Sequence, residues 1–162
     1  MEMKIQLSQD SIRINSIDFK GSICDGPGIR TVIYLQGCNF HCVGCHNPQT
    51  WDMDKGYIIP VEELFDKICR NSMYKRITIS GGEPLIQMDA VYRLMSLLKT
   101  AGFDIALYTG FDVDDVPTYI LKILNYIKCG KYIESLRSTT IPYVGSSNQI
   151  FKVVHEGEIN EK

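Results

Sequence analysis

Residues 31–45 read TVIYLQGCNFHCVGC, and this stretch decides the fold. Thr31 to Gln36 is rich in β-branched and aromatic residues, which is typical of a buried strand, and Gly37 ends it. Three cysteines, Cys38, Cys42 and Cys45, follow within eight residues. The stretch therefore predicts a buried strand with a metal-binding or redox loop at its end.

Outside this stretch, strand and helix patterns alternate along the chain. Apolar residues at three- and four-residue steps predict helices after Pro60, from Met88 to Leu98, and after Pro117. Such alternation implies right-handed crossover units and a mainly parallel sheet. Further strands are predicted at Arg76 to Ser80, Asp104 to Tyr108, Tyr126 to Cys129 and Gln149 to Val154.

The chain length limits the architecture. Its 162 residues, of which 44% are hydrophobic, suffice for one compact domain, and no repeat or linker divides them. We expect a single domain over residues 1–162. A closed (β/α)8 barrel takes about 250 residues, so five or six strands predict an α/β fold with a partial, open (β/α)6-type barrel. Its site should be open on one side.

Charge and hydropathy exclude several function classes. Seventeen Lys and Arg against 19 Asp and Glu give a net charge of −2, which argues against a nucleic-acid binder with a general basic surface. The sequence holds no run of about 20 apolar residues such as a membrane span needs. Met1 to Asp10 lacks the apolar stretch of a secretory signal. These features predict a cytoplasmic protein with no membrane partner, in which clustered thiols favour metal over disulfides.

A second motif follows the second predicted strand. Ser80-Gly-Gly-Glu-Pro84 comes directly after Arg76 to Ser80. Ligands of parallel sheets gather at the carboxyl ends of the strands, so this loop and the cysteine loop should share a site. Gly81 and Gly82 allow a ligand to approach the backbone closely, and Glu83 adds a charge that can pair with an ammonium group.

The cysteine triplet alone leaves three interpretations open. It can form a closed Cys3His zinc site, a closed four-thiolate iron–sulfur cluster, or a four-iron cluster whose fourth iron has no protein ligand. In the last case a substrate can chelate the open iron. The additional ligands would be His41 or His46 in the first case, and Cys24, Cys69 or Cys129 in the second.

Spacing favours the open cluster without excluding the others. Structural zinc sites usually combine two separated pairs of ligands, and the chain offers no second pair. Ferredoxins use spacings of four then two or two then two, whereas this loop has three then two. Cys69 belongs to the apolar stripe of a predicted helix, so we interpret it as a core residue.

The two motifs together resemble the radical S-adenosylmethionine (SAM) enzymes. Asp25-Gly-Pro-Gly-Ile-Arg30, Gln36-Gly-Cys38 and Cys45-His-Asn-Pro48 are similar to the activases of glycyl-radical enzymes. The short chain and three further motifs resemble the activating proteins of the anaerobic ribonucleoside-triphosphate reductase. These motifs are Tyr108-Thr-Gly-Phe111, Gly130-Lys-Tyr132 and Gly145-Ser-Ser-Asn-Gln149. Cys129 departs from the pattern, because relatives commonly carry Asp there.

The resemblance implies specific site residues. Cys38, Cys42 and Cys45 would bind three irons of a [4Fe-4S] cluster, and SAM would chelate the fourth. No catalytic residue beyond these ligands is implied. Gly44, Cys45, His46, Gly82 and Glu83 are the residues expected to contact SAM.

The resemblance also implies an activity and partners. An electron from the cluster would cleave SAM to methionine and a 5′-deoxyadenosyl radical, which would take a hydrogen from a glycine of a large glycyl-radical subunit. A flavodoxin or ferredoxin would supply the electron. An activase of the pyruvate formate-lyase type, which is usually longer, and a non-catalytic iron–sulfur or zinc module are the alternatives.

Overall fold

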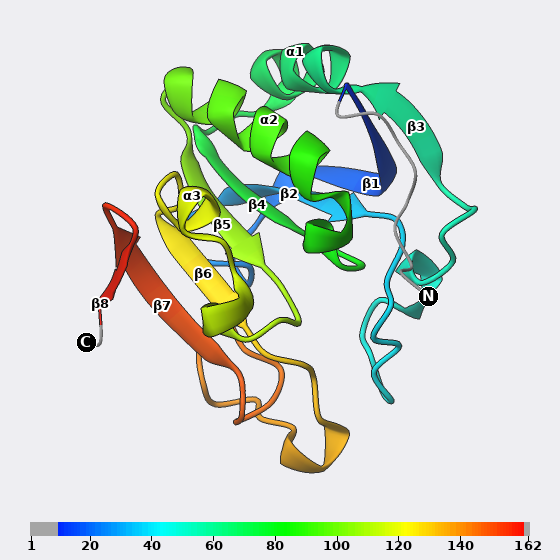
Figure 1. Cartoon of the computed structure of the whole chain (residues 1–162), viewed down its shortest axis with the longest axis vertical. Coiled ribbons are helices and arrows are strands. Elements are labelled where there is room, and N and C mark those ends of the chain that lie inside the picture. Colours follow the sequence, from blue (N-terminus) through cyan, green and yellow to red (C-terminus); the bar gives the residue numbers. More distant parts are fainter. Residues whose placement is uncertain (1–9, 161–162) are drawn as a thin grey trace.

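A computed structural model describes residues 10–160, which form one eight-stranded sheet flanked by helices (Figure 1). The strand order is β3-β1-β2-β4-β5-β6-β7-β8, and the end strands do not pair with each other. The strands are β1 (Ser11–Ser22), β2 (Arg30–Leu35), β3 (Tyr57–Pro60), β4 (Arg76–Gly81), β5 (Asp104–Tyr108), β6 (Tyr126–Cys129), β7 (Ile150–His155) and β8 (Glu158–Asn160). The helices are α1 (Val61–Asn71), α2 (Met88–Thr100) and α3 (Thr118–Leu121), with short 3₁₀ turns at Pro48–Thr50, Pro84–Gln87, Val113–Asp115 and Glu134–Leu136.

The expected open α/β arrangement is confirmed, and its parallel part is the centre of the sheet. Strands β2, β4, β5 and β6 are parallel to one another. Strands β1 and β3 on one side and β7 and β8 on the other pair antiparallel. The parallel centre aligns the carboxyl ends of β2 and β4, where Leu35 pairs with Gly81. Figure 1 shows the loops after β2 and β6 on the side of the molecule away from α1.

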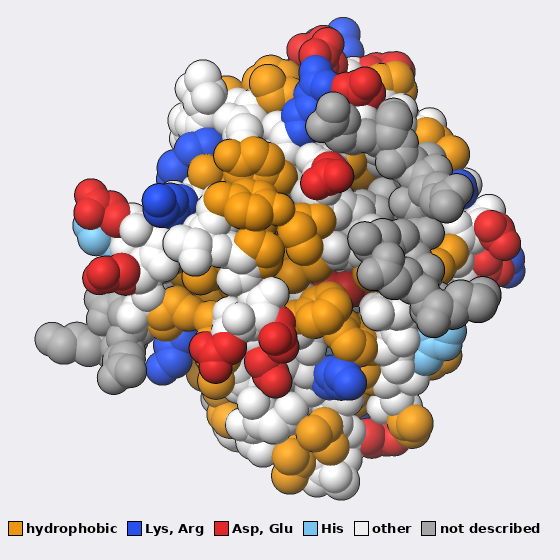
Figure 2. Space-filling view, viewed as in Figure 1, with side chains coloured by type: hydrophobic (Ala, Val, Ile, Leu, Met, Phe, Trp, Pro, Cys, Tyr) orange, Lys and Arg blue, Asp and Glu red, His pale blue; other side chains and the backbone are white. Residues whose placement is uncertain are grey.

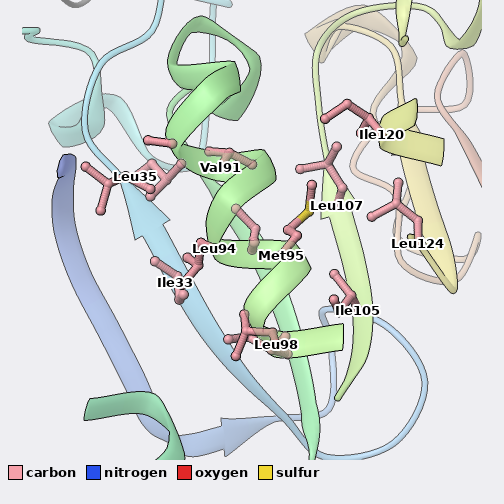
Figure 3. Close-up of a cluster of buried hydrophobic side chains, with 14 of the residues drawn as sticks. Ile33, Leu35, Val91, Leu94, Met95, Leu98, Ile105, Leu107, Ile120 and Leu124 are labelled. Carbon is pink, nitrogen blue, oxygen red and sulfur yellow. The ribbon is translucent and has the colours of Figure 1, made fainter. Parts of the chain in front are cut away.

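The hydrophobic core fills the space between the helices and one face of the sheet. Figure 3 shows Leu94 and Met95 of α2 directed toward Ile33 of β2 and toward β5. All three side chains are fully buried, and each such burial stabilises the fold by roughly 1.5–3 kcal/mol. Side chains of a strand alternate between its two faces, so Ser80, Tyr108 and Lys128 lie on the face opposite this core, and they line the pocket described below.

The helices agree with the apolar periodicity except at two places. Pro60 and Pro117 precede α1 and α3 as N-caps. Helix α3 ends at Leu121 rather than continuing to Leu124. Beyond Leu121 the backbone hydrogen bonds span three residues, as from Leu124 N to Leu121 O, which is the 3₁₀ pattern and not the α-helical one. Cys69 is exposed, so its interpretation as a core residue is wrong. Successive residues of an α-helix are rotated by about 100° around its axis. Cys69 follows the buried Ile68 and therefore lies off the buried face of α1.

Five predicted strands are present within one or two residues of their expected ends, as β2, β4, β5, β6 and β7. Three further strands, β1, β3 and β8, extend the sheet beyond them. None of the helices in residues 10–160 is both long enough and apolar enough to cross a membrane. The expectation that Met1 to Asp10 contains no secretory signal rests mainly on residues 1–9, which lie outside the described residues.

Candidate functional site

The cysteine loop and the Gly-Gly-Glu-Pro loop meet where the sequence predicts, at the ends of two adjacent parallel strands. Backbone hydrogen bonds join them, from Gly82 N to Leu35 O at 3.0 Å and from Glu83 N to Gly37 O at 2.8 Å. A Cβ on Gly82 would lie 2.1 Å from the carbonyl oxygen of Gly37. A glycine is therefore required at position 82 by the contact between the two loops themselves.

The cysteine loop is fixed at both ends by its own backbone. Gly37 N donates to Thr50 O at 2.6 Å, and Cys38 N donates to Trp51 O at 3.2 Å. Within the loop, Cys45 N donates to Cys42 O at 3.1 Å. These bonds fix the backbone of the loop, and its three cysteines line one pocket.

The three thiols are free and differ in burial. Cys38 is 8% exposed, whereas Cys42 and Cys45 are partly exposed. Burial raises the pKa of the Cys38 thiol, and the backbone N–H groups of His41 and Phe40 oppose that shift. Asn47 N donates to Cys45 Sγ at 3.4 Å. N–H groups directed at sulfur favour thiolates, which are the form that binds iron.

A pocket of about 570 Å³ contains these thiols. Its wall comes from the ends of β4, β5 and β6, the loop after β1, and the segment from Thr139 to Gly145. Two of its lining residues, Ile23 and Ile141, are exposed to solvent. The pocket therefore opens to solvent, in agreement with the open sheet that the chain length predicts.

The expected SAM contacts are only partly brought together. Cys45, His46 and Gly82 line the pocket, whereas Gly44 and Glu83 are absent from its lining. His46 is exposed, and its ring lies 5.2 Å from that of Tyr132. Gly44 has a φ of +75°, and a Cβ there would lie 2.7 Å from the Glu134 carboxylate carbon, so this glycine faces the loop after β6.

The expectation that Glu83 pairs with a ligand ammonium needs correction. Its side chain is fully buried, and its oxygens accept hydrogen bonds from Thr109 Oγ1, Gly110 N at 2.8 Å and Leu85 N at 3.3 Å. Burial raises the pKa of Glu83 to about 7. The carboxylate therefore ties the loop after β4 to the loop after β5, with its oxygens occupied by protein donors.

Several pocket residues could not be selected from sequence patterns. Tyr108 is the last residue of β5, Lys128 is the penultimate residue of β6, and Trp51 follows the cysteine loop. His41 stacks on Trp51 with ring centroids 4.8 Å apart, and it faces solvent. What these residues share in the sequence is a position at the end of a strand or next to the cysteines. That position identifies them as pocket residues only when the order of the strands in the sheet is known.

The residues present fit a four-iron cluster. Within residues 10–160, no three His, Cys, Asp or Glu side chains are arranged to hold a single metal ion. The three thiols instead line one pocket from separate positions of the loop, and a cluster offers each of them its own iron.

Comparison with known proteins agrees with this geometry. The family described as "4Fe-4S single cluster domain" matches residues 24–152. The pyruvate formate-lyase-activating enzyme of Clostridium pasteurianum is 42% identical over 102 residues, which are 60% of this chain and 42% of that protein. The chain thus spans about two fifths of the length of such relatives.

Two further relatives align over most of their length. The anaerobic ribonucleoside-triphosphate reductase-activating proteins of Vibrio cholerae and Escherichia coli are 31% and 28% identical, and each alignment covers 79% of this chain and 90% of the relative. Among solved structures, QueE from Escherichia coli has a TM-score of 0.50 at 24% identity, over 62% of this chain and 52% of that one, which supports the fold. The chain belongs to the 4Fe-4S single cluster family and, within it, to the radical SAM activases of glycyl-radical enzymes, whose cofactors are a [4Fe-4S] cluster and SAM.

Proposed function

We propose that this protein activates a glycyl-radical enzyme, and that its partner is an anaerobic ribonucleoside-triphosphate reductase. The observation that carries the proposal is the pocket in which three free thiols face the ends of β4, β5 and β6. When bound, the cluster would supply the low-potential electron for the reductive cleavage of SAM to methionine and a 5′-deoxyadenosyl radical, and that radical would take a hydrogen atom from a glycine of the partner.

The chain itself positions the reactants. Cys38, Cys42 and Cys45 are the proposed cluster ligands, and backbone hydrogen bonds fix their loop at the pocket. Gly82 and His46 form parts of the wall against which SAM would lie. The open side gives a glycine-bearing segment of the partner access to the pocket, and the segment then excludes water from it.

The choice of partner rests on the extent of similarity and on one loop. The two ribonucleotide reductase-activating relatives are matched over 90% of their length. The Gly145–Gln149 motif folds against the pocket: Gln149 Oε1 accepts from Gly145 N at 2.9 Å, and Gln149 Nε2 donates to Gly130 O at 2.9 Å. This motif therefore shapes the pocket directly, which supports its use in selecting the subfamily.

The domain organisation, the electron donor and the location in the cell are proposed from the sequence. We propose that residues 1–162 act as a single radical SAM domain and that the electron comes from a flavodoxin or ferredoxin. A cytoplasmic location fits the six cysteines, all of which are free of disulfides in the described residues. Neither nucleic acid nor membrane enters the proposed reaction.

Anaerobic reconstitution with iron and sulfide tests the cluster. We expect about four irons and four sulfides per chain, and formation of 5′-deoxyadenosine from SAM with dithionite. Cys42→Ala should abolish the product, whereas Cys24→Ala, an exposed thiol at the same pocket, should retain it. One zinc per chain without sulfide would refute the proposal and support a non-catalytic module.

A second experiment tests the partner. The reconstituted protein is mixed anaerobically with SAM and either an anaerobic ribonucleotide reductase or a pyruvate formate-lyase. We expect the glycyl doublet in electron paramagnetic resonance (EPR) spectra only with the reductase. Because the Clostridium relative is 42% identical, a doublet with the lyase alone would reassign the partner.

A further inference from the structure

Exposed apolar side chains lie around the opening of the cysteine pocket. Ile23 and Val43 are 72% and 76% exposed, and among the large hydrophobic residues in the described part of the chain only Met73 is more exposed. Single exposed apolar residues are common, but several around one opening indicate an interaction site. Figure 2 shows hydrophobic side chains at the lower end of the molecule, where Figure 1 places the loops after β2 and β6. We define the apolar collar as the exposed residues Ile23, Val43, Ile133, Leu136 and Ile141.

Two collar residues border the pocket directly. Ile23 belongs to the loop after β1 and Ile141 to the segment before β7, and both line the pocket. Backbone hydrogen bonds hold the segment of Ile141, from Ser138 N to Gly145 O at 3.0 Å and from Ser147 N to Leu136 O at 2.8 Å. A backbone that is fixed before binding lowers the entropy that a partner must remove.

Val43 adjoins this same segment from the cysteine loop. A Cβ on its neighbour Gly44 would lie 2.7 Å from the carboxylate carbon of Glu134. Glu134 begins the 3₁₀ turn that ends at Leu136, and Ile133 directly precedes that turn. The collar therefore continues from the cysteine loop to the loop after β6.

The charge pattern of these loops selects the kind of surface that fits them. Residues 37–51 and 138–150 contain no Asp, Glu, Lys or Arg, although 22% of the chain is charged. The exposed charges of Lys131, Glu134 and Arg137 lie between these two stretches in the sequence. Apolar centres flanked by charged residues are typical of protein interfaces. An uncharged apolar opening matches a partner that contributes apolar side chains, and not one that is held by charge.

We propose that the apolar collar docks the partner enzyme through apolar side chains next to its target glycine, an assignment that rests on the proposed function. The glycine has to enter the pocket, and the collar lies around the opening that it passes. Removing the exposed area of Ile23 and Val43 from water favours the complex. The docked segment also covers the opening and keeps water out of the pocket.

Charged substitutions at collar residues outside the pocket lining test this surface. The variants are Val43→Glu, Val43→Lys and Leu136→Glu. Met73→Glu is the matched control, because Met73 is 80% exposed and precedes β4, at the opposite end of that strand from the pocket. Sedimentation measures the affinity for the glycyl-radical enzyme that gives the EPR doublet with the wild type. Formation of 5′-deoxyadenosine from SAM is measured without that enzyme.

We expect the dissociation constant for the partner to rise at least tenfold in each collar variant. Iron content and partner-free cleavage of SAM should stay within twofold of the wild type, and Met73→Glu should change none of these quantities. Circular dichroism and iron content serve as checks on folding, and Ile133→Glu replaces a collar variant that fails them.

Glutamate and lysine at position 43 should weaken binding alike, because either charge loses water in an apolar contact. Opposite effects of the two would contradict the proposal and show that charge holds the partner. If the wild type forms the glycyl doublet and all collar variants bind the partner as tightly, the collar is overturned and the proposed function stands.

If the wild type cleaves SAM but forms no doublet with either enzyme, the proposed function and the docking surface are both overturned. A wild type that sediments alone as a dimer, which Val43→Glu dissociates, would instead assign the collar to a contact between two copies of this chain.

Discussion

The Thr109 hydroxyl donates a hydrogen bond to the carboxylate of Glu83, 2.9 Å from its Oε2 atom, across the ends of β4 and β5. Gly110 N donates to Oε1 of the same carboxylate at 2.8 Å. A fully buried carboxylate thus joins two loops that line the pocket. Its desolvation is only partly offset by these donors, because burial still raises the pKa of Glu83 to about 7.

This raised pKa predicts a pH-dependent stability of the cluster-free protein. The folded state holds the Glu83 proton more tightly than the unfolded state, whose carboxyl has the ordinary pKa of 4.5. The resulting stabilisation is fully present below pH 4.5 and is lost as the pH rises through about 7. We expect the free energy of unfolding to fall by up to about 3 kcal/mol between these limits.

Urea unfolding of wild type and Glu83→Gln at pH 5 and pH 7.5 measures this loss. The glutamine variant should lack the part of the pH dependence that Glu83 causes. An equal fall in stability in both proteins would show that other groups are responsible.

The side chain of Arg30 joins β2 to β4 and β5 by hydrogen bonds. Its guanidinium is fully buried and donates to Thr78 Oγ1 and the Ile77 carbonyl, both at 2.9 Å, and to Asp104 Oδ1 at 2.7 Å. Arg30→Met would leave these acceptors without their donor. We expect a loss of about 3–5 kcal/mol in the free energy of unfolding, measured in urea. Arg76→Met, at an exposed position, should change it by less than about 0.5 kcal/mol.

The central strands and the two motif loops could be predicted because their signals are local. Thr31 to Gln36 and Asp104 to Tyr108 are short apolar runs that end at glycine or polar residues, and they form β2 and β5. The antiparallel strands β1, β3 and β8 lack such signals. In β1, buried Ile12 and Ile14 are followed by partly exposed residues, and the strand depends on its antiparallel pairing with β2.

The roles of single side chains depended on contacts between distant residues. Glu83 resembles a free ligand-binding carboxylate in the sequence, but its partner Thr109 lies 26 residues further along the chain. Tyr108 and Lys128 become a pair only through the register of β5 and β6. Sequence patterns over a few residues contain neither of these contacts. The roles of the three side chains could therefore be assigned only from their burial and from the strand pairing in the structure.

The exposure of the cysteines predicts their reactivity. Cys129 is 2% exposed, and burial raises the pKa of its thiol to about 12, so little thiolate forms at pH 8. Cys24 and Cys69 are exposed. Iodoacetamide followed by mass spectrometry should label Cys24 and Cys69 at least ten times faster than Cys129 in the folded protein. Equal rates in the absence of denaturant would contradict the burial of Cys129.

The contact between Gly82 and Gly37 predicts that Gly82→Ala impairs the cysteine loop. The added Cβ would lie 2.1 Å from the Gly37 carbonyl oxygen, so one of the two loops must move. We expect the free energy of unfolding to fall by about 1–3 kcal/mol and cluster iron content to fall by at least half. Iron analysis after reconstitution and urea unfolding measure both effects.

Gly102→Ala is the matched control for this substitution. Gly102 has a φ of +91°, so alanine is strained there, but the nearest atom, Lys75 Nζ, would be 3.7 Å from the new Cβ. It should cost about 1 kcal/mol through backbone strain and leave iron content unchanged, because Gly102 follows α2, outside the pocket lining. A loss of iron in Gly102→Ala as large as in Gly82→Ala would mean that general destabilisation, and not the displaced cysteine loop, limits cluster binding.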